Sequence, residues 1–225
     1  MSKEYQQKIG IASTIPVGGN IMAYVDGVTL GQFTQFDPDG LMTTSSSDTK
    51  VLTETKAIKN TLIACGAGLT KYAGINGGMI QQGGAIIELS TAVMLEQNGA
   101  RDGIYLYMFH GKSILTFAGI YVYEGLGGLF LDYYDDAGTL VNCKVFPLVQ
   151  FEKYYWHSLK VKYNIQRGEY SSVTWDGEEI PLTGLKGGVV ATDNGSYALN
   201  WGIDFKVTDT TASDIYVDHV LAVAL

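Results

Sequence analysis

The chain has 225 residues, of which 28 are Gly and 15 are Tyr, and 15 Lys and Arg against 23 Asp and Glu give a formal net charge of −8. Hydrophobic residues at 46% and charged residues at 17% indicate a globular protein, and Gly without a fixed period excludes a collagen-like fibre. The acidic balance, with Arg101 and Arg167 as its two arginines, argues against the clustered basic surface that binds nucleic acid.

Residues 1–20 are predicted to form an N-terminal arm, followed by a single domain over residues 21–225. The polar start has neither the apolar core nor the cleavage site of a signal peptide. No run of 18 or more apolar residues occurs, so we expect no membrane insertion. No linker rich in Pro or Ser divides the rest of the chain, which favours one domain.

The predicted elements of the first half are short strands between turn signals, and a helix competes at one place. Residues 48–60 fit a helix, but Thr53 and Thr55 lower helix propensity and the same residues also alternate as a strand, so both alternatives stay open. The other elements are strand 21–25, the hairpin turn Asp26-Gly27, strand 28–33, turn 37–40, polar loop 43–49, strand 61–65, a Gly-rich connection 66–84 with a short strand inside, and strand 85–95.

The second half alternates more regularly. Within residues 156–165 we expect His157 and Leu159 on a buried face and Trp156 and Lys160 on the open face. The predicted strands are 104–109, 113–123, 129–134, 139–146, 156–165, 170–175, 178–182, 199–208 and 214–225. Roughly a dozen strands without intervening helices are typical of an all-β sandwich or barrel.

The cysteines and histidines give no metal pattern. Cys65 and Cys143 both lie in apolar, strand-like runs, so one disulfide and two buried free thiols remain open alternatives. His110, His157 and His219 are distant in sequence from both cysteines and from one another. We therefore expect core or surface roles for them and no zinc site.

Three segments of the last third resemble a known fold family. Residues 155–163 (YWHSLKVKY) are followed by residues 172–180 (SVTWDGEEI), and the chain closes with residues 214–220 (DIYVDHV). Together they resemble the concanavalin A-like jelly roll, in its laminin-G-type and glucanase-like branches, over about residues 30–225. The resemblance implies an antiparallel two-sheet β-sandwich whose concave face often binds sugars. Another two-sheet sandwich is the alternative, because each motif is a generic strand and turn.

The resemblance spans lectins, carbohydrate-binding modules, glycoside hydrolases, polysaccharide lyases and adhesive domains, and fold alone does not choose among them. Glycoside hydrolysis needs two carboxylates facing each other across the sugar, and the Glu-x-Asp-x-x-Glu spacing of laminarinase-type enzymes is absent. Glu88 stands alone, while the adjacent Glu178 and Glu179 point to opposite faces. An acidic chain also suits the polyanionic substrates of lyases poorly. We therefore predict a non-catalytic protein without a cofactor.

Carbohydrate binding needs exposed aromatic rings that stack on pyranose faces. Tyr121 and Tyr123 share one strand face, and so do Tyr105 and Tyr107, so each pair faces inward or outward together. The alternative is a structural role, in which such rings fill the space between two sheets. The candidate sugar-binding residues are Trp156, Trp175, Tyr121, Tyr123 and Tyr133, with Tyr105, Tyr107 and Tyr134 as further candidates.

Calcium is the one metal that the sequence leaves open. Asp132, Asp135 and Asp136 could supply oxygen ligands, although their spacing does not match an EF-hand loop. The competing interpretation is that these carboxylates cap a turn.

A virion would reconcile a fold typical of extracellular domains with the missing export signal. Coat, decoration and fibre subunits are made in a host cytoplasm and act outside it after assembly. We therefore predict a virion surface or structural protein, located on the virion or outside cells. Its expected partners are copies of itself, other virion proteins and glycans. A cellular carbohydrate-binding or adhesive module is the alternative, and a glycoside hydrolase or polysaccharide lyase is less favoured.

Overall fold

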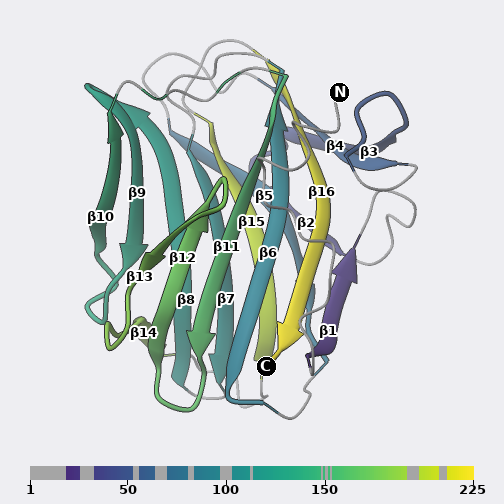
Figure 1. Cartoon of the computed structure of the whole chain (residues 1–225). Coiled ribbons are helices and arrows are strands. Elements are labelled where there is room, and N and C mark those ends of the chain that lie inside the picture. The colour runs from purple at the N-terminus through teal and green to yellow at the C-terminus, as the bar shows by residue number, and fades with distance from the viewer. Residues whose placement is uncertain are drawn as a thin grey trace.

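The computed structural model describes residues 19–25, 33–52, 56–63, 70–80, 84–96, 103–111, 114–147, 149, 152, 154–191, 198–207 and 212–225. Over these residues the chain forms sixteen strands in two antiparallel sheets, A and B, of eight strands each (Figure 1). The predicted all-β sandwich is thus confirmed. No helix in the described part is long and apolar enough to cross a membrane.

Sheet A contains both the best-patterned strand of the sequence and the C-terminal strand. In spatial order its strands are β13 (Glu178–Pro181), β12 (Glu169–Trp175), β11 (Trp156–Asn164), β6 (Ile86–Leu95), β16 (Ser213–Ala224), β4 (Ala57–Leu62) and β3 (Met42–Ser47). The first half of β16 pairs with β4, and its second half pairs with β1 (Asn20–Val25). Strands that are distant in sequence therefore lie side by side in the middle of the sheet, at β11–β6, β6–β16 and β16–β4, whereas β11 to β13 and β3 to β4 are neighbours in the chain as well (Figure 1).

Sheet B packs against sheet A and is built mainly from the middle of the chain. In spatial order its strands are β10 (Leu140–Pro147), β9 (Gly128–Tyr134), β8 (Ile114–Gly125), β7 (Ile104–Gly111), β15 (Ala198–Val207), β5 (Lys71–Gly78) and β2 (Thr34–Phe36). The short strand β14 (Gly188–Ala191) pairs with β8. The meander from β7 to β10 follows chain order, whereas β15 joins it from near the C-terminus.

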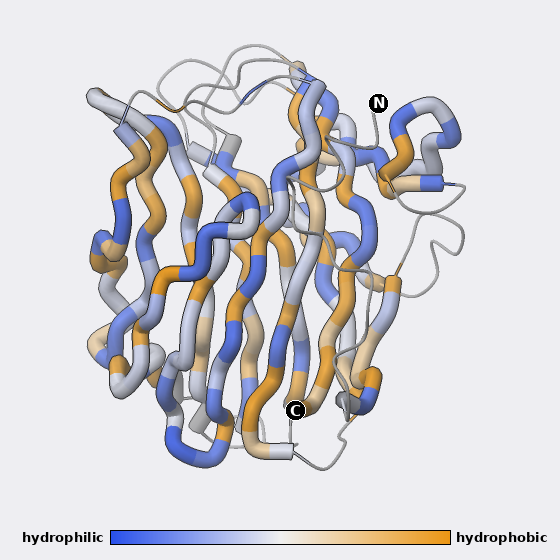
Figure 2. The backbone as a smooth tube through the Cα atoms, viewed as in Figure 1, coloured by the Kyte–Doolittle hydropathy of each residue, from blue (hydrophilic) through white to orange (hydrophobic). Residues whose placement is uncertain are grey.

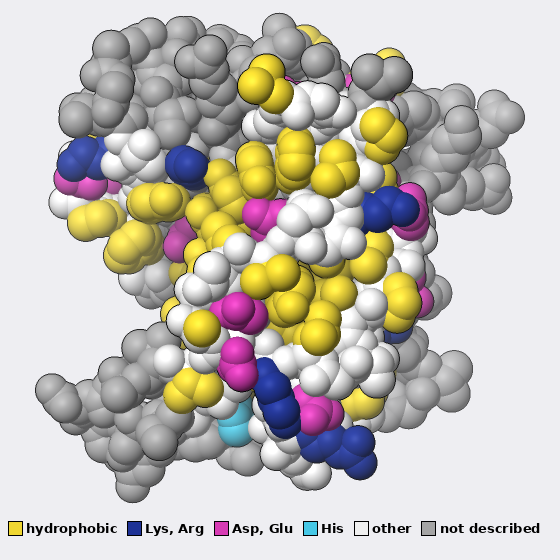
Figure 3. Space-filling view, turned by 90° about the vertical axis from the view of Figure 1, so that its left-hand side faces the viewer, with side chains coloured by type: hydrophobic (Ala, Val, Ile, Leu, Met, Phe, Trp, Pro, Cys, Tyr) yellow, Lys and Arg dark blue, Asp and Glu magenta, His cyan; other side chains and the backbone are white. Residues whose placement is uncertain are grey.

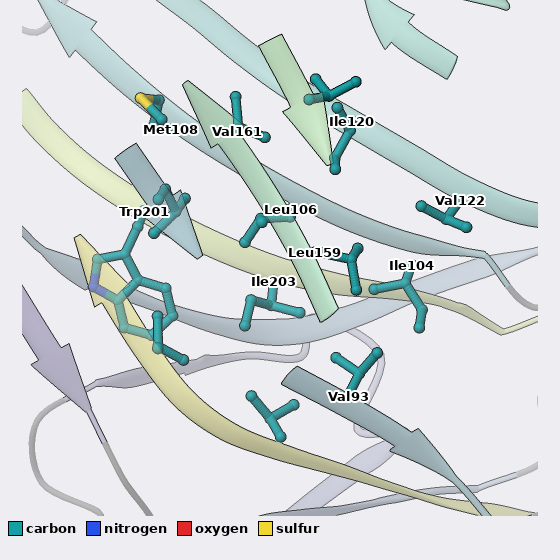
Figure 4. Packing of buried hydrophobic residues seen from close by; sticks show 14 of the residues in the cluster. Val93, Ile104, Leu106, Met108, Ile120, Val122, Leu159, Val161, Trp201 and Ile203 are labelled. Atoms are coloured by element: carbon teal, nitrogen blue, oxygen red, sulfur yellow. The ribbon is translucent and has the colours of Figure 1, made fainter. Parts of the chain in front are cut away.

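The core lies between the two sheets and follows from the alternation along each strand. Hydrophobic and hydrophilic residues alternate visibly along the strands (Figure 2). Leu159 and Val161 of β11 face Leu106 and Ile203 of sheet B, with the Trp201 ring beside them (Figure 4). The inward direction predicted for Leu159 is therefore confirmed. Burial of these apolar faces is the main force that holds the sheets together.

One stretch forms a strand where a loop was expected, and in part of another the structure decides between two open alternatives. Residues 43–49 were expected as a polar loop, but β3 takes up residues 42–47 and pairs with β4, where Thr44 Oγ1 donates to Asn60 Oδ1 at 3.0 Å. Polar Ser and Thr side chains fit this end strand because one of its faces stays partly exposed. Within residues 48–60, the described part from Ala57 onward is strand β4, so the extended alternative holds there.

Some expectations fall on residues that the structure does not describe. They are the arm up to residue 18, the Asp26-Gly27 hairpin and the Cys65 partner of a possible disulfide. Cys143 is a free thiol whose Sγ lies 3.1 Å from the Leu131 carbonyl oxygen. Burial raises the pKa of Cys143 to about 12, so the thiol stays protonated at neutral pH.

Candidate functional site

The outer face of sheet B carries a continuous group of aromatic side chains. On β7 the residues Leu106 and Met108 point into the core, which turns Tyr105 and Tyr107 to the outside. On β8 the same alternation turns Tyr121 outward. Both tyrosine pairs of the sequence therefore face away from the core, and they meet because β7 and β8 are neighbours.

The strand register arranges these residues in rows across the sheet. Asp204 of β15 is paired with Tyr105, Tyr105 with Tyr121, and Tyr121 with Asp132 of β9. The Tyr105 and Tyr121 rings stack with centroids 4.0 Å apart and planes inclined by 10°, and Tyr121 stacks on Tyr123 at 4.7 Å. The row therefore presents aromatic rings between two carboxylates.

A pocket of about 430 Å³ opens on this face, over β5, β7, β8 and β15. Figure 3, which views the molecule from the side of β9 and β10, shows hydrophobic side chains gathered in a broad patch with acidic side chains among them. The pocket is lined by Phe36, Tyr72, Asn76, Tyr105, Tyr107, Phe109, Phe117, Tyr134 and Asp204. Aromatic walls with a few polar groups are typical of a small-molecule or sugar site.

Glycine makes room for the large side chains of this pocket. Gly202 lies between Asn76 on β5 and Tyr107 on β7, and a Cβ atom at position 202 would overlap the Tyr107 ring. A Cβ atom at Gly74 would likewise overlap the Asp204 carboxylate. The Tyr107 ring and the Asp204 carboxylate can therefore lie against the sheet because these two positions lack side chains.

Asp204 is the carboxylate of the pocket. Its Oδ1 accepts a hydrogen bond from Tyr107 Oη at 3.2 Å. Burial raises the pKa of Asp204 to about 6, and the Tyr107 hydrogen bond offsets only part of this effect. Burial also raises the pKa values of Tyr105 and Tyr107, so both phenols are neutral hydrogen-bond donors at physiological pH.

The candidate calcium ligands do not form a cluster. Asp132 accepts a hydrogen bond from Asn142 Nδ2 at 2.8 Å, whereas Asp135 Oδ1 caps its own turn by accepting from the amides of Ala137 and Thr139. Asp136 is exposed. The residues that the structure describes contain no group of three His, Cys, Asp or Glu that could hold a metal ion. For Asp135, turn capping is what the structure shows.

Three candidate sugar-binding rings are buried away from the pocket, which corrects their assignment as exposed stacking surfaces. Trp156, expected on the open face of β11, is 2% exposed because Leu52 and Tyr216 pack with it on the outer face of sheet A. Trp175 is 3% exposed in the core, and its ring stacks on His157 at 4.9 Å. Tyr133 points into the core.

Of the other candidates, Tyr121 and Tyr123 lie on the outer face of sheet B beside the pocket, although Tyr121 is only 4% exposed. The further candidates Tyr105, Tyr107 and Tyr134 line the pocket itself. Sequence reasoning missed Asp204, because an isolated acid in a strand carries no motif. Its signal was the alternation of β15, where Ile203 and Phe205 are apolar and the acid between them must face the other way. The other missed lining residues are Phe36, Tyr72, Asn76, Phe109 and Phe117.

A second, more polar pocket of about 210 Å³ lies on the outer face of sheet A. Its two lysines already form ion pairs with carboxylates: Lys160 Nζ lies 2.8 Å from Oε1 of the neighbouring Glu88, and Lys162 Nζ lies 3.5 Å from both Glu88 and Glu179. Ser172 Oγ donates to Glu179 at 2.5 Å. Because these groups already satisfy one another, the aromatic pocket of sheet B is the better candidate site.

No protein-family model and no curated protein matches the chain, whereas solved structures match over most of its length. An endo-beta-1,4-glucuronan lyase from the fungus Trichoderma reesei is 12% identical, with a TM-score of 0.63 over 92% of this chain and 96% of that one. A carbohydrate esterase of the Shiga toxin-encoding bacteriophage phi24B is 12% identical, with a TM-score of 0.61 over 92% and 99%.

A legume lectin-like domain from Entamoeba histolytica is 10% identical, with a TM-score of 0.51 over 87% and 91% of the two chains. At this level of identity the similarity concerns the fold and carries no assignment of activity. With its two antiparallel sheets, the chain has the concanavalin A-like jelly-roll fold, which carbohydrate-active enzymes and lectins share.

Proposed function

We propose that this protein binds carbohydrate in the aromatic pocket of sheet B without cleaving it. The observation that carries the proposal is a pocket whose walls are aromatic rings and whose polar groups include Asp204 and Asn76. Aromatic faces stack on the apolar faces of pyranose rings, while a carboxylate and an amide accept and donate hydrogen bonds to sugar hydroxyls.

The spacing of the carboxylates supports binding over hydrolysis. Asp204 and Asp132 lie in one row but on β15 and β9, with β7 and β8 between them. Three strand spacings of about 4.8 Å separate them by roughly 14 Å. The two carboxylates of a glycosidase lie only about 5 to 9.5 Å apart, across one glycosidic bond.

A glycan array followed by calorimetric titration tests this proposal. Tyr72 is 39% exposed and packs edge-to-face on Tyr105, so Tyr72→Ala should weaken binding by about tenfold without unfolding the protein. Tyr155→Ala is the matched control, because Tyr155 is 42% exposed and does not line the pocket. Absence of any glycan ligand, or equal losses in both variants, would refute the proposal. Release of reducing sugar from a bound glycan would overturn its non-catalytic part.

The virion role is a further part of the proposal, and its support comes from the sequence. Glycan recognition suits both a virion surface subunit that attaches to a host and a cellular adhesive module. The two differ in assembly, because virion subunits form closed symmetric oligomers. Light scattering of the full chain separates them, and a monomer would favour the cellular module.

A further inference from the structure

The charge of the aromatic pocket restricts the glycans that it can accept. Among the residues that the structure shows lining this pocket, Asp204 is the charged one, and neither Lys nor Arg is present. Its carboxylate forms no salt bridge in the described part of the chain, and Tyr107 Oη is its hydrogen-bond partner. No Lys or Arg among the lining residues therefore balances this partly buried negative charge.

A buried carboxylate with a single neutral partner is an unfavourable arrangement. Loss of hydration raises the free energy of the charged form, and this is the cause that raises the pKa of Asp204 to about 6. A cation in the pocket would offset the loss, because it would both neutralise the charge and restore hydrogen bonds. An anionic group in the same place would be repelled.

The aromatic rings around Asp204 favour a cation as well. Ring faces carry negative electrostatic potential and attract ammonium groups within about 6 Å of their centroids. The same face already shows such a contact, since Lys206 Nζ lies 5.7 Å from the centroid of the Tyr121 ring. Tyr121 in turn stacks on Tyr105, which lines the pocket beside Asp204.

From this arrangement we propose that the glycan recognised by this pocket carries free amino groups, and that an ammonium group of the sugar pairs with Asp204 among the rings of Tyr105 and Tyr107. The inference rests on the proposed function and gives it a ligand class. It also distinguishes this pocket from one that binds uronic acid polymers, which would require cations in place of Asp204.

The test compares two oligosaccharides that differ only in the amino group. Glucosamine oligomers and N-acetylglucosamine oligomers of equal length and linkage are titrated into the full chain at pH 6.5 and physiological salt. The wild type should bind the glucosamine oligomer at least tenfold more tightly. Chemical N-acetylation of that same oligomer should remove the advantage.

Two variants localise the effect. Asp204→Asn keeps the shape of the side chain and a hydrogen-bond acceptor for Tyr107, so it should abolish the preference for the amino sugar. Asp132→Asn removes a carboxylate from the same face, outside the pocket, and should keep the preference. Circular dichroism and melting temperature verify that both variants are folded.

The outcomes separate the inference from the proposed function. Binding of glycans with no preference for amino groups, or with preference for acetylated or acidic sugars, overturns the inference and leaves carbohydrate binding intact. A preference that survives in Asp204→Asn also overturns it, because the ammonium group would then pair elsewhere. Absence of binding to every glycan of the array refutes both.

Discussion

His157 Nδ1 lies 2.7 Å from Asp176 Oδ2, which joins two residues 19 positions apart. The other oxygen of the same carboxylate, Asp176 Oδ1, accepts the backbone amide of Ser158 at 2.8 Å. Asp176 has a φ of 46°, and it begins the hairpin turn between β12 and β13. One turn residue therefore links the β12–β13 hairpin to the start of β11, and this link belongs to the segments that resemble the jelly-roll family.

The Asp176 link predicts a stability effect that does not involve the pocket. Asp176→Ala removes both hydrogen bonds and should lower the free energy of unfolding by about 1–3 kcal/mol, measured by urea titration. Asp176→Asn is the control, because it keeps an acceptor oxygen and tolerates the left-handed backbone conformation. Equal stability of the alanine variant and the wild type would show that the link contributes nothing.

Asp204 predicts a pH-dependent difference in stability. Its pKa rises from 3.8 in an exposed chain to about 6 when folded. Its contribution to stability is therefore fully present below about pH 4 and is lost as the pH rises through 6. An Asn side chain at position 204 is neutral at every pH. The free energy of unfolding of Asp204→Asn should therefore exceed that of the wild type at pH 7 by roughly 2 kcal/mol.

Chemical denaturation at pH 4, 5, 6 and 7 measures the Asp204 effect. The difference between Asp204→Asn and the wild type should shrink towards pH 4. A difference that does not vary with pH would show that the carboxylate is not destabilised by burial.

The glycine beneath the pocket predicts an effect on both binding and folding. Gly202→Ala places a methyl group where the Tyr107 ring lies, so the ring must move. We expect a loss of about 1–3 kcal/mol of stability and a clear loss of glycan affinity. Gly78→Ala serves as control, because its Cβ would meet only Asn200 Oδ1, at 3.9 Å. Wild-type affinity in the Gly202 variant would contradict the assigned position of the pocket.

Removing the Trp156 ring should reduce stability without changing glycan affinity. The ring is 2% exposed and packs in a small cluster on sheet A with Met94 and Tyr216. Trp156→Ala should therefore lower stability by about 3–5 kcal/mol, measured by thermal and urea unfolding. Glycan affinity of the fraction that remains folded should be unchanged. A selective loss of binding without loss of stability would return Trp156 to the list of sugar-stacking residues.

The strands of the last third were predictable because their signals are local. The alternation around Leu159 and the turn at Asp176-Gly177 specify strand, face and hairpin within a few residues of each other. The stretch at residues 43–49 was not predictable in this way. Its Ser and Thr residues fit a loop and an end strand equally well until β4 is in place beside them. Its pairing partner decides its structure.

The candidate site also combines features that local sequence patterns predict with features that only strand pairing decides. Alternation implied that Tyr105 and Tyr107 share a face, as do Tyr121 and Tyr123, yet it left open which face was covered. For Trp156, alternation correctly implied the outer face of β11, but residues from other segments bury that face. Asp204 joined the tyrosines only when β15 was inserted beside β7, and no local pattern specifies that pairing.

By itself, the sequence determined that this chain forms an all-β sandwich with acidic charge and without a glycosidase carboxylate motif. These properties depend on side-chain period, turn chemistry and composition, which all act over short distances along the chain. Only the tertiary structure decided which aromatic residues lie on the outer face of sheet B and which carboxylate they surround. Strand order and the covering of each face arise from pairings between residues distant in the sequence. Tyr107 and Asp204 are 97 positions apart, and Asn20 pairs with Ala224 although they lie near opposite ends of the chain. Such pairings depend on packing of the whole sandwich.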